Sequence, residues 1–342
     1  MFEKVNAGHP DKMADRLAGA VVDLVYERAG GLTKANPRVA CEVLAGHGKV
    51  YVMIETSLTQ EQLSGDDIDP LIHRIFGEDV EGKVTIVPQD VHLADNQQGS
   101  VRCGDNGIFK GCAPTHEQRL LTAIATSIYD KYPTDGKYLV GDANAIVSMG
   151  RDGRFIVDAT ESRIKCLDNL KTLTICQSHA SIDEIDELIR EFFAKNGGKL
   201  PTGNDEIVSK ETGQVEIKTT AAFLKGKWYA WGNTINPLGE WTGGINTDCG
   251  ATNRKLGSDM GDGVTGGGLH GKDLSKADVS VNIFCYLESI RTGHEVTACC
   301  SIGDETVCGI PYKDIVEQAR LYIQTIGGFE KFAMWGLIRA KD

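Results

Sequence analysis

The stretch Gly266-Gly267-Gly268-Leu269-His270-Gly271-Lys272-Asp273-Leu274-Ser275-Lys276 joins a glycine-rich loop to a helical repeat of apolar residues, Val279, Ile283, Phe284 and Leu287. Three glycines carry no side chains, so such a loop can turn its backbone N–H groups toward an anion. Lys272 and Lys276 lie four residues apart, so they would share one face at the start of this helix, where the dipole also favours anions. The stretch therefore predicts a polyphosphate site.

The same stretch matches only part of the Walker A motif of nucleotide-binding P-loops. Gly266, Gly271 and Lys272 fit Gly-x-x-x-x-Gly-Lys, but Asp273 stands where Ser or Thr would place a hydroxyl on magnesium. Residues 256–265 are polar and glycine-rich, whereas a P-loop follows an apolar strand. The pattern disfavours a P-loop NTPase, and for this stretch alone a solvated loop with two lysines is an alternative.

Composition limits the class of protein. The chain has 342 residues, of which 41% are hydrophobic, which is enough for two or three compact domains. A net charge of −12 argues against nucleic-acid and membrane-surface partners, whose binding needs a basic excess. The 10 cysteines are scattered and read as reduced thiols. Neither a signal peptide nor an apolar run of spanning length is present, so we expect a cytoplasmic protein.

Periodicity predicts an α+β fold with mixed sheets. A helix should begin at Gly8-His9-Pro10-Asp11-Lys12, with His9 at its cap and Asp11 in its first turn. Residues 38–44 and 49–56 alternate as a hairpin that carries Glu42 and Glu55, which need a partner only if they face inward. Further helices are expected at 69–76, 117–132, 182–193 and 312–326. Further strands are expected at 84–87, 172–177, 227–231 and 295–302, with a hairpin of 137–148 and 155–158. Residues 95–99 and 104–107 read as turns.

The unusual residues share one chemistry. The cations Arg254, Lys255, Lys272 and Lys276 accompany the carboxylates Asp11, Asp105, Asp142, Asp248 and Asp278. Mg²⁺ prefers one or two carboxylates together with water and phosphate oxygens, and lysine and arginine offset the charge that grows on a departing polyphosphate. No Gly-x-Ser-x-Gly elbow and no zinc spacing occur. The residues predict ATP-dependent, magnesium-assisted transfer, without naming the acceptor.

Several motifs together resemble those of one family. They are Gly8-His9-Pro10-Asp11-Lys12, Val39-Ala40-Cys41-Glu42, Gly104-Asp105-Asn106-Gly107, Asp248-Cys249-Gly250 with Arg254-Lys255, and the stretch from Gly266 to Asp273. In this order they resemble methionine adenosyltransferase, also called S-adenosylmethionine synthetase, as far as about Gly303. The resemblance implies that ATP and L-methionine are the substrates, that methionine sulfur attacks the ribose C5′ of ATP, and that the tripolyphosphate is hydrolysed to phosphate and pyrophosphate.

The resemblance also implies an architecture. Three interleaved domains with pseudo-threefold symmetry would comprise an N-terminal domain (1–7 plus 116–243), a central domain (8–100 plus 244–280) and a C-terminal domain (101–115 plus 281–342). Active sites would be built between the two subunits of a homodimer, which could pair into a tetramer. Mg²⁺ and K⁺ would be the cofactors.

Matching positions acquire roles through the resemblance. Catalysis would rest on His9, which assists departure of the polyphosphate, and on Lys272 and Arg254. ATP and its phosphates would be bound by Lys12, Asp142, Trp241, Arg254, Lys255, Lys272, Lys276 and Ile302. Methionine would be bound by Glu55, Gln98, Asp105, Asp248 and Lys276. The metal ligands would be Asp11 and Asp278 for Mg²⁺ and Glu42 for K⁺. Trp241 and Ile302 would lie on opposite faces of the adenine.

The chain also departs from the family pattern. Asn144 replaces the lysine of an Asp-x-Lys motif, Ala7 replaces a glutamate, and only four residues separate Gly99 from Gly104, where the family has a longer mobile gate. The part after Ile302 is short and divergent. Two alternatives therefore stand beside an active transferase. One is a catalytically weak paralogue that binds nucleotide or pairs with another subunit, and the other is a hydrolase of ATP or tripolyphosphate on the same fold.

Overall fold

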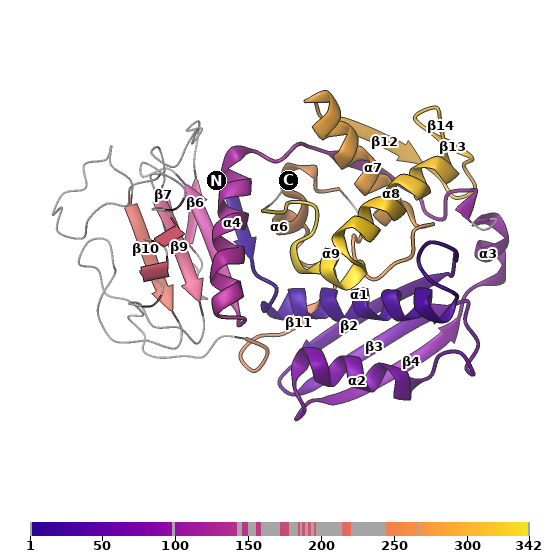
Figure 1. The fold of residues 1–342 in the computed structure, drawn as a ribbon, viewed down its shortest axis with the longest axis horizontal. Coiled ribbons are helices and arrows are strands. Elements are labelled where there is room, and N and C mark those ends of the chain that lie inside the picture. Colours follow the sequence, from indigo (N-terminus) through magenta and orange to yellow (C-terminus); the bar gives the residue numbers. More distant parts are fainter. Residues whose placement is uncertain are drawn as a thin grey trace. The chain divides into compact units, whose positions relative to one another are not determined.

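The computed structural model describes residues 2–97, 100–141, 146–149, 155–158, 172–177, 184, 187–188, 191–192, 195, 214–219, 244–265 and 267–340. The chain divides into two compact units (Figure 1). The first contains Met1–His9, Pro114–Gly244 and Ile338–Asp342, and the second contains Pro10–Ala113 and Ile245–Leu337. The second unit spans the ranges predicted as a central and a C-terminal domain, whose separation and pseudo-threefold relation stay predictions.

The first unit is built on a four-stranded sheet. Its strand order is β1 (Phe2–Val5), β6 (Gly136–Gly141), β9 (Thr172–Gln177) and β10 (Gln214–Thr219). The first three strands are antiparallel and β10 runs parallel to β9. Helix α4 (His116–Lys131) packs on β1 and β6, and its first turn is fixed by Thr115, whose hydroxyl accepts a hydrogen bond from the Gln118 N–H. A separate hairpin pairs β7 (Ile146–Met149) with β8 (Phe155–Asp158).

The second unit contains a sheet with two unlike faces. Its order is β11 (Gly250–Ala251), β2 (Val39–Gly46), β3 (Lys49–Thr56) and β4 (Glu81–Pro88). Buried and outward side chains alternate along β2 and β3, so one face is apolar and covered. The other face, called the open sheet face below, carries Leu44, Tyr51 and Met53, each about half exposed (52%, 51% and 51%).

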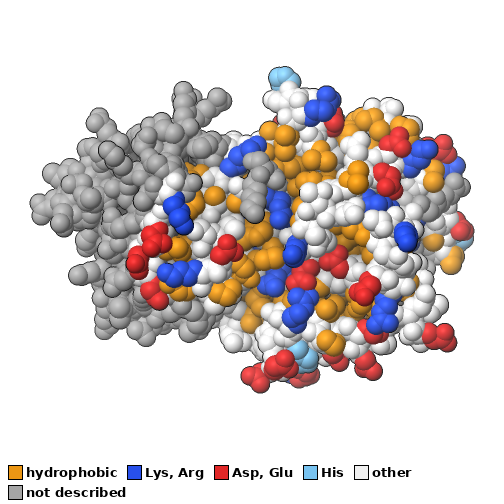
Figure 2. All heavy atoms as spheres, viewed as in Figure 1, with side chains coloured by type: hydrophobic (Ala, Val, Ile, Leu, Met, Phe, Trp, Pro, Cys, Tyr) orange, Lys and Arg blue, Asp and Glu red, His pale blue; other side chains and the backbone are white. Residues whose placement is uncertain are grey.

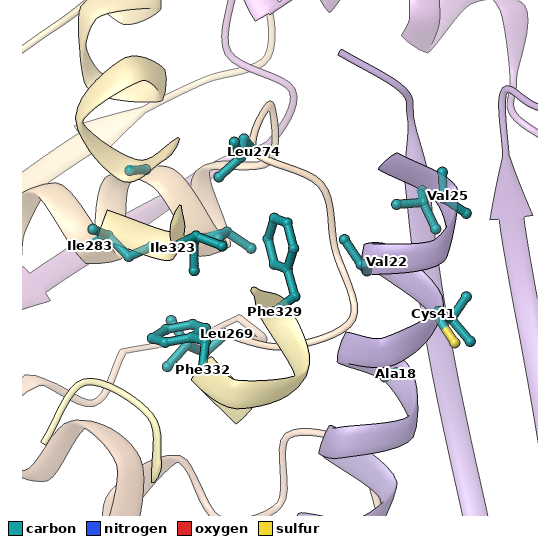
Figure 3. Packing of buried hydrophobic residues seen from close by; sticks show 14 of the residues in the cluster. Ala18, Val22, Val25, Cys41, Leu269, Leu274, Ile283, Ile323, Phe329 and Phe332 are labelled. Carbon is teal, nitrogen blue, oxygen red and sulfur yellow. The ribbon is translucent and has the colours of Figure 1, made fainter. Parts of the chain in front are cut away.

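The apolar face is covered by a helix from the N-terminal part of the chain, and a helix from the C-terminal part packs on that helix. In Figure 1, α1 (Pro10–Arg28) runs between this sheet and α9 (Phe329–Trp335), while α2 (Gly65–Phe76) packs on α1 and β4. Figure 3 shows Val22 of α1, Phe329 of α9 and Leu274, which follows the glycine loop, in one apolar cluster. The glycine loop is therefore anchored in the core on its C-terminal side.

The remaining elements complete the second unit. Strand β12 (Val296–Cys300) pairs with β5 (Gly107–Gly111), and β13 (Thr306–Val307) pairs with β14 (Ile310–Pro311). Helix α7 (Ala277–Thr292) packs on this first pair and on α8 (Tyr312–Ile326). Short segments α3 (Val91–Gln97), α6 (Leu256–Met260) and η3 (Gly261–Gly263) connect the larger elements.

The structure confirms the predicted α+β class with mixed sheets, and corrects several elements. The hairpin at 38–56 and the helices at 10–28, 116–131 and 312–326 form as predicted. Of the hairpin predicted from 137–148 and 155–158, residues 146–149 (β7) pair with 155–158 (β8) as predicted, whereas residues 137–141 belong to β6, which pairs with β1 and β9 in another sheet. The predicted turn at 95–99 begins inside α3, and α9 and β10 were not predicted. The strand expected at 227–231 lies outside the described residues.

Charges on the surface are mixed. Arg74 pairs with Glu330 and Arg28 with Asp67, and Figure 2 shows Lys and Arg side chains interspersed with Asp and Glu on the face in view. Within the described ranges, none of the helices has both the length and the apolar character needed to cross a bilayer.

Candidate functional site

The C-terminal end of the glycine loop forms one isolated β-bridge with β2 of the second unit's sheet. The Cys41 N–H donates to the Gly271 carbonyl (2.7 Å) and the Asp273 N–H donates to the Val39 carbonyl (3.0 Å), so Lys272 forms an antiparallel bridge opposite Ala40. Gly271 has a φ of 83°, and a side chain there would overlap the Cys41 carbonyl oxygen. The close approach of loop and strand therefore requires this glycine.

This pairing corrects the predicted placement of the two lysines. Lys272 does not lie on the helix, because its backbone belongs to the bridge with β2. Helix α7 begins at Ala277, and Lys276 is its N-cap. The two ammonium groups are therefore held by different backbone segments on either side of the turn 273–276, rather than by one helical face.

One half of the candidate site is formed by Asp278, Lys272 and Asp105. Asp278 occupies the first turn of α7, and its Oδ2 accepts from the Lys272 ammonium. Burial raises the pKa of Asp105 above its ordinary value, and the charge of the adjacent Asp278 and a hydrogen bond to it raise it further. The Lys276 ammonium lies 3.5 Å from the Gly104 carbonyl, next to Asp105. Two carboxylates so placed require a cation or a shared proton.

The other half is organised by Asp11 at the start of α1. Its Oδ1 accepts from the Ala251 N–H (2.9 Å) and its Oδ2 from the Lys255 ammonium (2.6 Å). Arg254 approaches the same carboxylate at 3.5 Å, and about half of its side chain (52%) stays exposed. A first-turn carboxylate thus orders the turn that carries two predicted phosphate-binding cations.

Lys12, the residue after Asp11, belongs to a buried charge cluster. The Lys12 ammonium is 2.6 Å from Asp259 Oδ2 and 3.1 Å from Asp15 Oδ2, and His270 Nε2 is 2.9 Å from Asp259 Oδ2. Burial alone would lower the pKa of Lys12, but Asp259 and Asp15 raise it above its usual value. Burial raises the pKa of Asp15. Sequence reasoning missed Asp15, Asp259 and His270; only the spacing of Lys12 and Asp15, three apart on a helix, could have indicated one of these contacts.

These carboxylates differ in how well they fit a metal ion. Asp15, Asp259 and His270 offer ligand atoms within 4.8 Å of one another, but the Lys12 ammonium already provides a cation for both carboxylates. Asp11 and the pair Asp105–Asp278 fit Mg²⁺ better, because they are hard oxygen ligands beside lysine ammonium groups that could turn to a bound polyphosphate. Asp11 and Asp278 were predicted as magnesium ligands and Asp105 as a methionine-binding residue, and all three roles stay predictions.

Other predicted residues lie at the surface. Glu42 is on the open sheet face and accepts from the Thr252 hydroxyl, and Glu55 lies opposite Ala40 on the neighbouring strand. Asp248 is exposed and accepts from the Cys249 N–H at 2.8 Å. Ile302 is exposed, and its N–H donates to Asn106 Oδ1 at 2.8 Å. The structure thus leaves these four outside the buried charge cluster.

The remaining predicted residues fall elsewhere. His9 is buried and belongs to the first unit, with its N–H donating to the Asn6 carbonyl at 3.1 Å. Gln98, Asp142 and Trp241 lie outside the described residues, as does Asn144. Their predicted roles in binding methionine, nucleotide and adenine stay predictions.

Comparison with known proteins supplies independent observations. Residues 1–81 match the N-terminal domain family of S-adenosylmethionine synthetases. The S-adenosylmethionine synthase of Bradyrhizobium diazoefficiens is 27% identical over 311 aligned residues, covering 81% of this chain and 70% of that protein. That of Flavobacterium johnsoniae is 26% identical over 357 aligned positions, covering 95% and 77%. The structure of an unusual S-adenosylmethionine synthetase from Campylobacter jejuni has a TM-score of 0.62 at 19% identity and covers 100% of this chain and 96% of its own, which shows a shared fold.

Proposed function

Because this chain belongs to the S-adenosylmethionine synthetase family, we propose that it is a transferase that forms S-adenosylmethionine from ATP and L-methionine, releasing phosphate and pyrophosphate. In this reaction a bond forms between the methionine sulfur and the ribose C5′, while the bond from C5′ to the triphosphate oxygen breaks. The electron pair leaves with the tripolyphosphate, which water then hydrolyses to phosphate and pyrophosphate. A chain that catalyses it must stabilise that growing negative charge.

One observation carries the proposal: two groups of paired cations and carboxylates form within the same compact unit. Asp11 holds Lys255 and Arg254, and Asp278 holds Lys272. Before substrate binds, the negative charge of each carboxylate offsets the positive charge of the side chains paired with it. When ATP enters, the ammonium and guanidinium groups would turn to the phosphates, and Mg²⁺ bound by Asp11 and Asp278 would offset further phosphate charge. Positioning and charge stabilisation are then the chain's whole contribution, with no covalent nucleophile.

The other roles extend this proposal through the family resemblance. His9 would assist departure of the polyphosphate, Lys12 and Lys276 would bind phosphate, and Glu42 would bind K⁺. The adenine and methionine subsites would be completed by Asp142, Trp241, Ile302, Glu55, Gln98, Asp105 and Asp248. Complete burial of Lys12 between Asp15 and Asp259 adds a condition: it could reach phosphate only if that cluster rearranges.

A homodimer with shared active sites is part of the same proposal. Leu44, Tyr51 and Met53 leave apolar surface on the open sheet face, and Glu42 and Glu55 of the predicted site lie on that face too. A second copy packed there would bury the apolar side chains and bring these carboxylates into an interface.

The experiment is mass spectrometry of products after incubation with ATP, methionine, Mg²⁺ and K⁺. Methionine-dependent formation of S-adenosylmethionine with phosphate and pyrophosphate is expected. Lys272→Ala and Asp278→Asn should each lower turnover at least about tenfold, because they remove a phosphate cation and a metal ligand. Lys110→Ala is the matched control, since this lysine pairs with Glu295 at the surface (2.8 Å). Wild-type rates from both site variants contradict the assignment.

Asn144, which replaces a family lysine, favours a second candidate, a catalytically weak nucleotide-binding paralogue. ATP binding without an adenosylated product would select this candidate. Release of phosphate from ATP at the same rate with and without methionine would instead identify a hydrolase.

A further inference from the structure

Asp273 is the residue at which the Walker A match fails, and the proposed reaction gives it no role. It is fully buried, at 0% exposure. Because a buried carboxylate is costly unless each oxygen is satisfied, its partners indicate what it does.

Both oxygens of Asp273 accept hydrogen bonds from backbone N–H groups. Oδ2 accepts from Val39 at the start of β2 (2.9 Å), and Oδ1 accepts from Ser275 in the following turn (2.8 Å). The Arg38 guanidinium lies 3.6 Å from Oδ1 and offsets the charge. The Asp273 N–H also donates to the Val39 carbonyl at 3.0 Å. One residue thus ties the loop to β2 and closes the turn that leads into α7.

Three groups of the proposed site depend on this turn. Lys272 directly precedes Asp273, and the Lys276 N–H donates to the Asp273 carbonyl at 3.2 Å. The Ser275 carbonyl accepts from the Gly104 N–H at 3.0 Å, which fixes the residue before Asp105. The Tyr312 hydroxyl donates to the same Ser275 carbonyl at 2.6 Å. The two lysines and Asp105 are therefore spaced by a single buried turn.

We propose that Asp273 is a positioning residue that sets the spacing of Lys272, Lys276 and Asp105 for a magnesium polyphosphate, a role that rests on the proposed function. An aspartate is required by the bonding pattern. Asparagine would keep one acceptor oxygen, but its NH₂ group would face either the Val39 N–H or the Ser275 N–H, and two donors repel. A hydroxyl, as in a P-loop, is too short to serve both amides.

Asp23 offers a matched control in the same unit. Its two oxygens also accept from two backbone N–H groups, those of Phe329 (2.8 Å) and Glu330 (2.9 Å), at the start of α9. None of the proposed substrate-binding residues is among these partners. Asp23→Asn therefore reports the effect of losing such a carboxylate on the fold alone.

The test measures calorimetric binding of inorganic tripolyphosphate with Mg²⁺, which needs no turnover, together with kcat and KM. Asp273→Asn should weaken tripolyphosphate binding at least about tenfold and lower kcat more than it changes the KM for methionine. Asp23→Asn should leave both unchanged. Equal effects of the two variants, or wild-type binding by Asp273→Asn, overturn the proposal.

Three further outcomes keep the result decisive. If Asp273→Asn is insoluble, Asp273→Glu, which keeps both acceptors one methylene further out, should still weaken binding, and unchanged binding by it refutes the role. If the wild-type chain binds tripolyphosphate but forms no S-adenosylmethionine, the proposed function fails while the positioning role stands. Absence of tripolyphosphate binding by the wild-type chain overturns both.

Discussion

Replacing Gly271 by alanine tests the close contact between the glycine loop and β2. Gly271 has a φ of 83°, and an added Cβ would overlap the Cys41 carbonyl oxygen and lie 3.1 Å from Ala18 Cβ. Gly48→Ala is the matched control, because Gly48 has a φ of 75° and nothing within 4 Å of an added Cβ. The two variants share the same backbone strain, and only the first adds the overlap.

The expected magnitudes follow from these contacts. Alanine in the left-handed region costs about 1 to 2 kcal/mol, and both variants lose this much stability. To relieve the overlap at Gly271, the loop must move away from β2. That movement breaks the bonds from the Cys41 N–H to Gly271 and from the Asp273 N–H to Val39, each worth about 1 kcal/mol. Gly271→Ala should therefore lose about 2 kcal/mol more free energy of unfolding than Gly48→Ala.

Urea denaturation followed by circular dichroism measures this difference, provided that the denaturant slopes agree. Calorimetric binding of tripolyphosphate gives a second reading, because movement of the loop also displaces Lys272. Gly271→Ala should weaken this binding and Gly48→Ala should not. Equal stability losses in the two variants would refute the reasoning, since they would mean that the loop does not depend on contact with β2.

Three other predictions address the buried cluster, a titrating carboxylate and the open sheet face. Lys12→Met leaves Asp15 and Asp259 without their ammonium and should cost about 3 to 5 kcal/mol in urea denaturation, whereas Lys49→Met on the surface should change little. Burial raises the pKa of Asp23 to about 6, with Glu330 and Arg74 facing it. The native chain then holds a proton that the unfolded chain has lost, so stability should fall by about 2 to 3 kcal/mol as pH rises from about 4 to about 6, and thermal unfolding of Asp23→Asn should lack this slope. Met53→Arg should convert a dimer to a monomer in sedimentation, and an unchanged mass would exclude this face as the interface.

The sequence predicted the elements whose side chains follow a local period. Alternation along 38–56 gave the hairpin, and apolar spacing gave α1 and α8, since one buried face is enough to specify each. Helix α9 has only seven residues and follows two glycines with positive φ, so packing against α1, rather than periodicity, forms it. The start of α7 was placed too early because pairing with β2 takes the backbone of Lys272.

The candidate site was predicted only where its residues belong to local sequence motifs. Asp11, Lys255, Lys272 and Asp278 come together as charged residues in recognisable motifs. Asp259 and His270 have no local signal, because their pairing with Lys12 joins residues 247 and 258 positions apart. Asp273 was noticed only as a mismatch to a motif, and its two backbone partners are visible only in three dimensions.

The interleaving of the two units has a consequence for synthesis of the chain. The second unit begins at Pro10 but closes only with Ile245–Leu337, after Pro114–Gly244 has been made. Until then, α1 has no α9 to cover it, and β2 has no glycine loop at its edge. A nascent chain must hold these apolar surfaces without their partners, which slows folding and exposes it to aggregation. A fragment that stops near residue 113 should consequently need a chaperone, although it contains Asp11 and the strands β2, β3 and β4.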